Sequence, residues 1–267
     1  MRTVVITGSA RGLGFEMAKL FKKNNLNVVI SDLKEENLKI AKEELDKIES
    51  KSSALYKVCD VTKSKDIKDL ILFVKSNFDS IDIWINNAGV NQPEKAIWEL
   101  REKEIDFVFD VDLKGTVMCS KLVVDEMIKN NWCGAIYNVE GYGSNDAKML
   151  GLSIYGTSKR AITYFTEALA KEVEERKTNI IVGKLSPGIM ITDFIKTALG
   201  DKEKINLSDK IKKVYNILGD TPDVVAQFLV QGMLNNRKNN VKIEWLTTKK
   251  AAWRFMTSGF NKRDFFK

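Results

Sequence analysis

Residues 3–14, TVVITGSARGLG, decide the fold of this chain. A short apolar, β-branched run leads into three glycines, and an amphipathic segment begins among them. Such a strand–turn–helix lets the backbone approach a pyrophosphate closely, and the N-terminus of the helix offers unpaired N–H groups and a partial positive charge. We therefore predict a dinucleotide-binding turn made of Gly8, Ser9, Arg11, Gly12, Leu13 and Gly14.

The same alternation of strand-like and helix-like segments continues to about residue 246. Expected strands cover Thr3–Thr7, Asn27–Ser31, Ala54–Val58, Ile81–Ile85, Ala135–Val139, Asn179–Leu185 and Val241–Leu246. Helical periodicity covers residues 12–24, 34–50, 63–78, 100–131, 155–177 and 222–236. Because most of the strands are unbroken apolar runs, both of their faces must be covered. The pattern predicts an α/β fold with a parallel sheet of about seven strands and helices on both faces.

Residues 1–267 contain no linker, repeat or low-complexity tract, so we predict one domain. Residues 189–220 lack strong periodicity between two expected strands and are the candidate substrate lid. Several apolar residues in this segment suggest a hydrophobic substrate, although a helix that packs on its own core would show the same pattern. The aromatic tail at 247–267 is expected to pack over the core or an oligomer interface.

Composition removes several kinds of chemistry. The 267 residues include 43 Lys and Arg, 36 Asp and Glu, and no histidine, so histidine-based nucleophiles, bases and metal sites are excluded. The three cysteines lie far apart and are expected to be buried thiols in a reducing compartment; we expect no metal.

The expected partners and location also follow from composition. Acids and bases alternate in segments such as 34–51 and 167–177, as on solvated helix faces, so we expect no nucleic-acid partner. No apolar run approaches the roughly 20 residues of a membrane-spanning helix, and the N-terminus is a strand rather than a signal peptide. We expect no membrane partner and a cytoplasmic location.

Further coenzyme contacts are expected where the next strands end. Asp32 can accept hydrogen bonds from both ribose hydroxyls of an adenosine and repel a 2′-phosphate, which favours NAD; Leu33 follows it. The carboxylate could also cap a helix, and nearby Arg11 and Lys34 keep NADP as the alternative. The remaining candidates at these strand ends are Asp60 and Val61 beside an adenine, and Asn87, Ala88 and Gly89.

Tyr155 and Lys159 begin a predicted helix and lie on the same helical face because they are four residues apart. An ammonium near a phenol stabilises phenolate and lowers its pKa toward neutrality. This pair provides an acid–base group without histidine, although the spacing alone also fits an ordinary helix start. Past the sixth strand, Pro187 and Gly188 turn the chain over the sheet, with Ile189 and Thr192 predicted near the coenzyme.

Together these motifs resemble the short-chain dehydrogenase/reductase family from Thr3 to about Leu246. The resemblance implies a Rossmann-like domain, a nicotinamide coenzyme, and interconversion of an alcohol and a ketone or aldehyde. It implies Tyr155 as the proton donor or acceptor, and Lys159 as the residue that lowers the phenol pKa and holds the nicotinamide ribose. Family members are usually dimers or tetramers with contacts through helices like those at 100–131 and 155–177.

Two positions depart from the family pattern. Asp112 replaces the usual asparagine, and an ionised Asp only accepts hydrogen bonds, so we expect it to pair with Lys159. Gly141 falls where the catalytic serine is expected, and Ser144 is the substitute candidate, 11 residues before Tyr155. These departures motivate the alternative of a dinucleotide-binding sensor or scaffold with little or no catalysis.

A narrower resemblance, to the chlorophyll b reductase branch, rests on YNVEGYGS at 137–144, GTVMCSK at 115–121, YGTSKRA at 155–161, KLSPGIMITD at 184–193 and DTPDVVAQFLV at 220–230. The branch has a similar GxGS loop, which supports a catalytic role for Ser144. Its members typically use NADPH, which conflicts with Asp32. The resemblance therefore implies a similar loop in this chain but not a pigment substrate.

Overall fold

The structure is a computed structural model that describes residues 1–191, 209–260 and 263–266. Its strands form one parallel sheet in the order β3-β2-β1-β4-β5-β6-β7. Their bounds are β1 Thr3–Thr7, β2 Asn27–Asp32, β3 Ala54–Val58, β4 Ile83–Asn86, β5 Gly134–Val139, β6 Ile180–Ser186 and β7 Val241–Glu244. The predicted parallel sheet is confirmed, with each strand within two residues of its expected ends.

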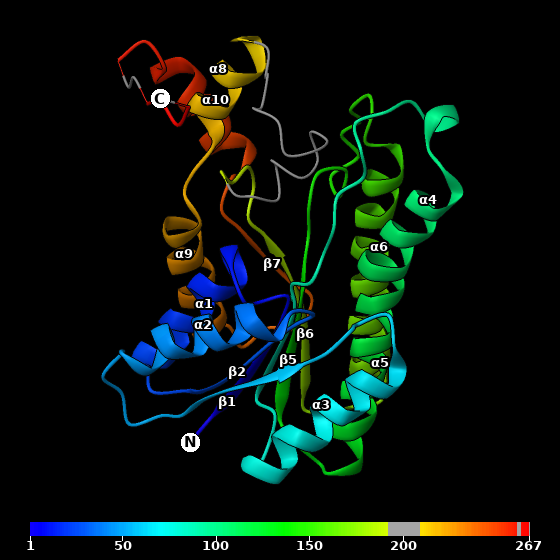
Figure 1. Ribbon diagram of the computed structural model, residues 1–267, viewed down its shortest axis with the longest axis vertical. Coiled ribbons are helices and arrows are strands. Elements are labelled where there is room, and N and C mark those ends of the chain that lie inside the picture. Colours follow the sequence, from blue (N-terminus) through cyan, green and yellow to red (C-terminus); the bar gives the residue numbers. More distant parts are fainter. Residues whose placement is uncertain (192–208, 261–262, 267) are drawn as a thin grey trace.

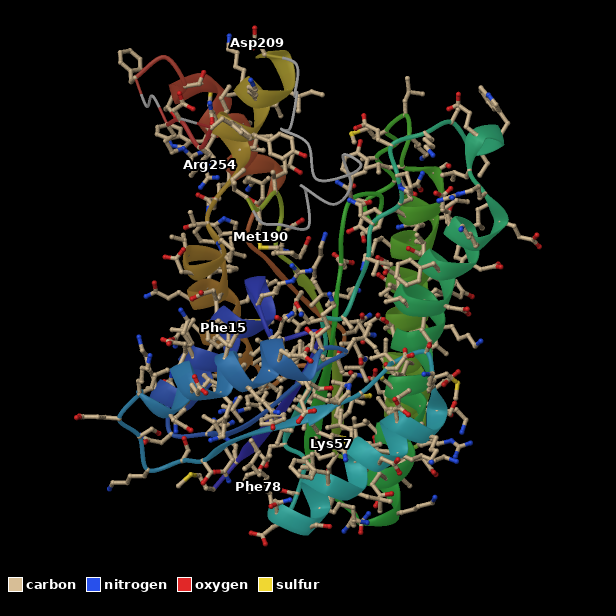
Figure 2. The ribbon with its side chains drawn as sticks, viewed as in Figure 1. Phe15, Lys57, Phe78, Met190, Asp209 and Arg254 are labelled. Carbon is tan, nitrogen blue, oxygen red and sulfur yellow. The ribbon has the colours of Figure 1, made fainter. Side chains whose placement is uncertain are left out.

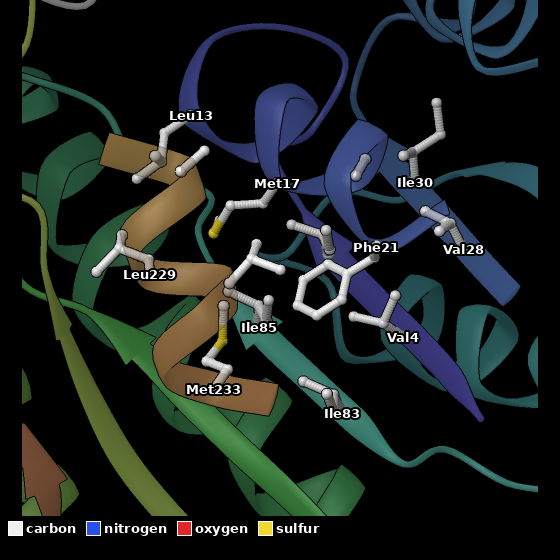
Figure 3. Packing of buried hydrophobic residues seen from close by; sticks show 14 of the residues in the cluster. Val4, Leu13, Met17, Phe21, Val28, Ile30, Ile83, Ile85, Leu229 and Met233 are labelled. Atoms are coloured by element: carbon white, nitrogen blue, oxygen red, sulfur yellow. The ribbon is translucent and has the colours of Figure 1, made fainter. Parts of the chain in front are cut away.

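Helices cover both faces of the sheet, as the unbroken apolar strands require (Figure 1). One face carries α1 Gly12–Lys23, α2 Glu35–Asp46 and α9 Pro222–Asn235. Successive strand residues alternate between the faces: Val4 and Ile6 pack under these helices, and Val5 packs on the opposite side. Figure 3 shows Met17 and Phe21 of α1 and Met233 of α9 packed over Val4 and Ile85.

The other face carries α3 Ser64–Asn77, α5 Thr116–Lys129 and α6 Ser153–Glu175. The helical periodicity predicted over 100–131 is confirmed for residues 102–129, but the helix is not regular throughout. The chain there forms α4 Glu102–Val108, a π-helical segment Phe109–Gly115, and then α5. π-helical turns occur frequently at functional sites, and this one contains Asp112.

Two helices were not predicted: α8 Asp209–Leu218 and α10 Thr248–Thr257. They pack on each other, and Figure 1 shows both at the end toward which the strands run, beside the C-terminus. Cys59 and Cys119 are buried, but the prediction for Cys133 is wrong, because it is exposed. None of the described helices has the length and apolar character needed to cross a bilayer.

Candidate active site

The loops after β1 and β4 meet where the order of the strands reverses. Chain order runs outward from β1 to β3 on one side and from β4 to β7 on the other, and parallel sheets bind ligands at such a switch point. The Thr7 hydroxyl accepts the N–H groups of Asn87 and Ala88, both at 3.1 Å. The Asn87 amide donates to the carbonyls of Thr7 and Gly8 at 3.0 and 2.7 Å. These bonds hold the two loops together.

The glycine turn fits the pyrophosphate of a dinucleotide. Gly8 and Gly12 have φ of +59° and +60°, which non-glycine residues rarely adopt. A Cβ at Gly14 would lie 2.6 Å from the Asn87 amide nitrogen, so only glycine permits this packing. Arg11 precedes α1 and provides no side-chain cap, so the first N–H groups of the helix face the turn. Ser9 is buried and donates to the Ile6 carbonyl, which makes it part of the turn's support.

Asp32 lies against the same turn. One carboxylate oxygen accepts the Ala10 N–H at 3.3 Å, and the other accepts the N–H of Leu33 at 2.8 Å. The side chain is only partly buried and keeps acceptor capacity for ribose hydroxyls. It does not cap α2, whose N-cap residue is Lys34.

Asp60 supports its own loop after β3. Its carboxylate accepts both the N–H and the hydroxyl of Thr62, at 3.0 and 2.7 Å. Partial burial would raise its pKa, but the hydrogen bonds from Thr62 and Lys63 outweigh burial and lower it. Val61 is buried and packs closely on Gly115.

Tyr155, Lys159 and Asp112 form a buried cluster beneath the β4 loop. The Lys159 ammonium lies 2.9 Å from one Asp112 oxygen and 5.4 Å from the centre of the Tyr155 ring. The other Asp112 oxygen accepts the Val90 N–H at 2.7 Å. A Cβ at Gly89 would lie 3.5 Å from the ammonium, so this loop covers the ion pair. The predicted pairing of Asp112 with Lys159 is present.

The expected lowering of the Tyr155 pKa is wrong in direction. Burial raises the pKa of Tyr155 to about 12; Lys159 opposes this and Asp112 adds to it. Burial also raises the pKa of Asp112 against the opposing charge of Lys159. Burial would lower the pKa of Lys159, but the Asp112 carboxylate raises it above its ordinary value. The Asp112 carboxylate thus offsets the positive charge of Lys159, which was expected to lower the pKa of the Tyr155 phenol.

The loop after β5 brings Gly141, rather than Ser144, against the phenol. A Cβ at Gly141 would lie 2.3 Å from the Tyr155 hydroxyl. The Ser144 hydroxyl accepts the Gly141 N–H at 3.2 Å and donates to the Lys159 carbonyl at 3.3 Å. These contacts make Ser144 a brace between the loop and α6. Its predicted contact with the substrate oxygen stays a prediction.

Gln92 is a site residue that the sequence analysis missed. Its buried side-chain oxygen accepts the N–H groups of Ile154 and Tyr155 at 2.7 and 2.8 Å, and its amide donates to the Gly151 carbonyl at 2.6 Å. It therefore caps the start of α6 from 62 residues away and fixes the backbone of Tyr155. No local signal identifies such a cap, because Gln92 lies in the loop after β4, far from α6 in the sequence.

Changing Gln92 to Ala should leave two buried N–H groups unpaired. We expect this to lower the free energy of unfolding by about 1–3 kcal/mol. Turnover should fall more than substrate KM changes, because the Tyr155 backbone loses its anchor. Chemical denaturation and steady-state kinetics measure both effects. Gln92→Glu keeps the acceptor oxygen but loses the donor to the Gly151 carbonyl, so it should recover the turnover only in part. An Ala variant as stable and active as the wild type would contradict this positioning role.

The chain that follows β6 packs against the segment that follows β7. Gly188 has φ of +72°, and a Cβ there would lie 2.6 Å from Leu246. Ile189 and Ile191 pair through their backbones with Asp220, both at 3.1 Å. Pro187 and Ile189 therefore follow the carboxyl end of the sheet as predicted. Thr192 and most of the predicted lid, 192–208, lie outside the described residues.

Comparison with known proteins identifies the family. Residues 2–203 match the family model for short chain dehydrogenases. The chain belongs to the short-chain dehydrogenase/reductase family. Its Rossmann-like fold agrees with a short chain dehydrogenase structure from Bacillus anthracis, with a TM-score of 0.76 and 26% identity over 91% of this chain and 94% of that one.

Two curated relatives come from Arabidopsis thaliana. The chlorophyll(ide) b reductase NOL is 31% identical over 85% of this chain and 64% of its own length. The probable chlorophyll(ide) b reductase NYC1 is 29% identical over 99% of this chain and 54% of its own length. This chain thus spans less than two thirds of either relative. Within the family, the chain has a likeness to the chlorophyll b reductase branch.

Proposed function

We propose that this protein reduces a carbonyl group to an alcohol, or the reverse, with Tyr155 exchanging the proton on oxygen. The observation that carries the proposal is the buried Tyr155–Lys159–Asp112 cluster beside the dinucleotide-binding turn. A phenol with a pKa of about 12 is protonated at neutral pH, so the protein is ready to donate a proton during reduction. Oxidation needs phenolate and should be favoured as pH rises.

Different residues would bind the coenzyme and orient the reacting phenol. Gly8, Gly12 and the start of α1 would hold the pyrophosphate, and Asp32 the adenosine ribose. A bound nicotinamide supplies or accepts the hydride. Lys159, held by Asp112, would bind the nicotinamide ribose and orient Tyr155. We retain Ser144 as a candidate donor to the substrate oxygen, which would require its hydroxyl to leave the Lys159 carbonyl.

The coenzyme is proposed to be NAD, with NADP as the alternative. Replacing Asp32 with Ser removes a carboxylate that would repel a 2′-phosphate. We expect the ratio of kcat/KM for NADPH to that for NADH to rise by at least about tenfold. Glu36→Ser in the first turn of α2 is the control and should leave the ratio unchanged. A wild-type protein that already prefers NADPH would overturn the assignment.

A hydrophobic substrate and a homodimer or homotetramer complete the proposal. One named relative is a chlorophyll(ide) b reductase and the other a probable one, which supports an apolar carbonyl compound. Large side chains are exposed on the helices of one face, namely Phe107 of α4, Ile128 of α5 and Tyr164 of α6. Such residues suit contact with a second copy. The cytoplasmic location stays a prediction.

A panel of aldehydes, ketones and alcohols, each assayed with both coenzymes, tests the proposed activity. We expect coenzyme-dependent product formation, identified by mass spectrometry, for apolar carbonyl compounds. Tight coenzyme binding without turnover of any compound would favour the sensor or scaffold alternative. Asp112 and Gly141 are the departures that favour this alternative, and intact Tyr155 and Lys159 oppose it.

A further inference from the structure

The net positive charge of the chain comes from two short segments. Residues 209–218 and 248–267 contain nine Lys and Arg against two Asp, a net charge of +7. The whole chain also has a net charge of +7, so the remaining residues are balanced. The mixed-sign surface expected from the sequence therefore describes most of the molecule but not these segments.

Within the described residues the two segments form one surface, which we call the C-terminal cap: α8, α10 and residues 258–260 and 263–266, with seven Lys and Arg against two Asp. Buried Asp220 joins its parts, because its carboxylate lies 2.6 Å from the Arg254 guanidinium and 3.0 Å from that of Arg263. Trp245 donates to the same carboxylate at 2.6 Å. The cap is thus fixed to the end of β7, with Lys213 and Lys249 exposed on it.

The cap also exposes large apolar side chains among its cations. Trp253 is 62% exposed, Met256 71% and Phe260 93%. Tryptophan and phenylalanine flanked by Lys and Arg are typical of helices that lie in the headgroup region of a bilayer. The lining of a cavity of about 280 Å³ beside α8 includes the cations of Lys212, Lys213 and Arg263, together with Asn216, Ser258 and the carboxylate of Asp209. Its cations and polar donors suit an anionic headgroup.

We propose that the C-terminal cap docks on an anionic lipid bilayer, with Trp253, Met256 and Phe260 entering the headgroup boundary. Each Lys or Arg near such a surface strengthens the attraction to anionic lipid. The exposed apolar groups disfavour a duplex nucleic acid, which is bound mainly through its phosphates, and a two-fold contact between copies would bring two positive surfaces together. This proposal replaces the expectation that a membrane is not a partner.

The position of the cap relates docking to the proposed reaction. Figure 2 shows Asp209 and Arg254 at one end, Met190 after β6 below them, and Phe78 near the opposite end. A protein docked through the C-terminal cap would turn the carboxyl ends of its strands toward the lipid. Delivery of an apolar substrate from the bilayer rests on the proposed function, whereas docking itself does not.

Vesicle flotation of the full chain tests the docking. We compare vesicles of phosphatidylcholine with vesicles of equal parts phosphatidylcholine and phosphatidylserine, at low and high salt. We expect binding to the anionic vesicles at low salt and its loss at high salt. Lys213→Glu with Lys249→Glu should weaken binding by at least about tenfold, and Trp253→Ala with Phe260→Ala should also weaken it.

The matched control is Lys68→Glu with Leu72→Ala on exposed positions of α3, at the other end of the molecule, which should leave vesicle binding unchanged. Equal binding by all variants, or no preference for anionic vesicles, would overturn the proposal. So would loss of a wild-type dimer in the Trp253/Phe260 variant, or duplex DNA binding that depends on the same lysines without vesicle binding. Reduction of a water-soluble carbonyl, measured without vesicles, tests the proposed function separately.

Discussion

Replacing Tyr155 with Phe is expected to lower turnover by at least about a hundredfold, the usual contribution of a general acid or base. The ring stays, so packing under the β4 loop and coenzyme affinity should change little. Only the hydroxyl that contacts Gly141 is lost. Steady-state kinetics and coenzyme titration measure the two quantities.

Tyr137→Phe is the matched control for this variant. Tyr137 is also buried, but its hydroxyl accepts a hydrogen bond from Asn236, at the end of α9. Removing that hydroxyl should leave turnover close to the wild type. Unchanged turnover in the Tyr155 variant would contradict its role in proton transfer.

Changing Asp112 to Asn should move the pH dependence of both reactions to lower pH. The negative charge of Asp112 raises the pKa of Tyr155, so its removal lowers this pKa. Alcohol oxidation needs phenolate, so its activity should begin to rise at a lower pH than in the wild type. Carbonyl reduction needs the protonated phenol, so its activity should begin to fall at a lower pH than in the wild type. Profiles of kcat/KM in both directions measure the shift.

Asp112→Leu tests the same ion pair through stability. It leaves the buried Lys159 ammonium without its partner, which should lower the free energy of unfolding by about 3–5 kcal/mol. Asp110→Asn, two residues away and paired with Lys114 at the surface, is the control and should have a small effect. A pH profile that stays in place in Asp112→Asn would contradict the coupling between Asp112 and Tyr155.

The local sequence was enough to predict the sheet and the motifs at its carboxyl edge. Apolar runs such as Thr3–Thr7 mark buried strands, and glycines such as Gly8 mark the turn, because both depend on nearest neighbours in the chain. The i,i+4 spacing likewise placed Tyr155 and Lys159 on one face of α6. The pairing of Asp112 with Lys159 followed from charge.

The features that the sequence did not predict depend on contacts between residues far apart in the chain. Gln92 caps α6 across the fold, and the π-helical segment at Phe109–Gly115 follows from packing rather than periodicity. The Tyr155 pKa depends on burial, which the spacing of Tyr155 and Lys159 does not reveal. The concentration of charge in the C-terminal cap could have been counted in the sequence, but its exposure required the structure.

The most direct test of proton transfer by Tyr155 is the pH dependence of kcat/KM for alcohol oxidation in the wild type and in Tyr155→Phe. For the wild type, we expect activity to rise with pH as the phenol loses its proton. The residual activity of the variant should lack that ionisation. The same rise in both proteins would show that another group carries the proton and would contradict the assignment of Tyr155.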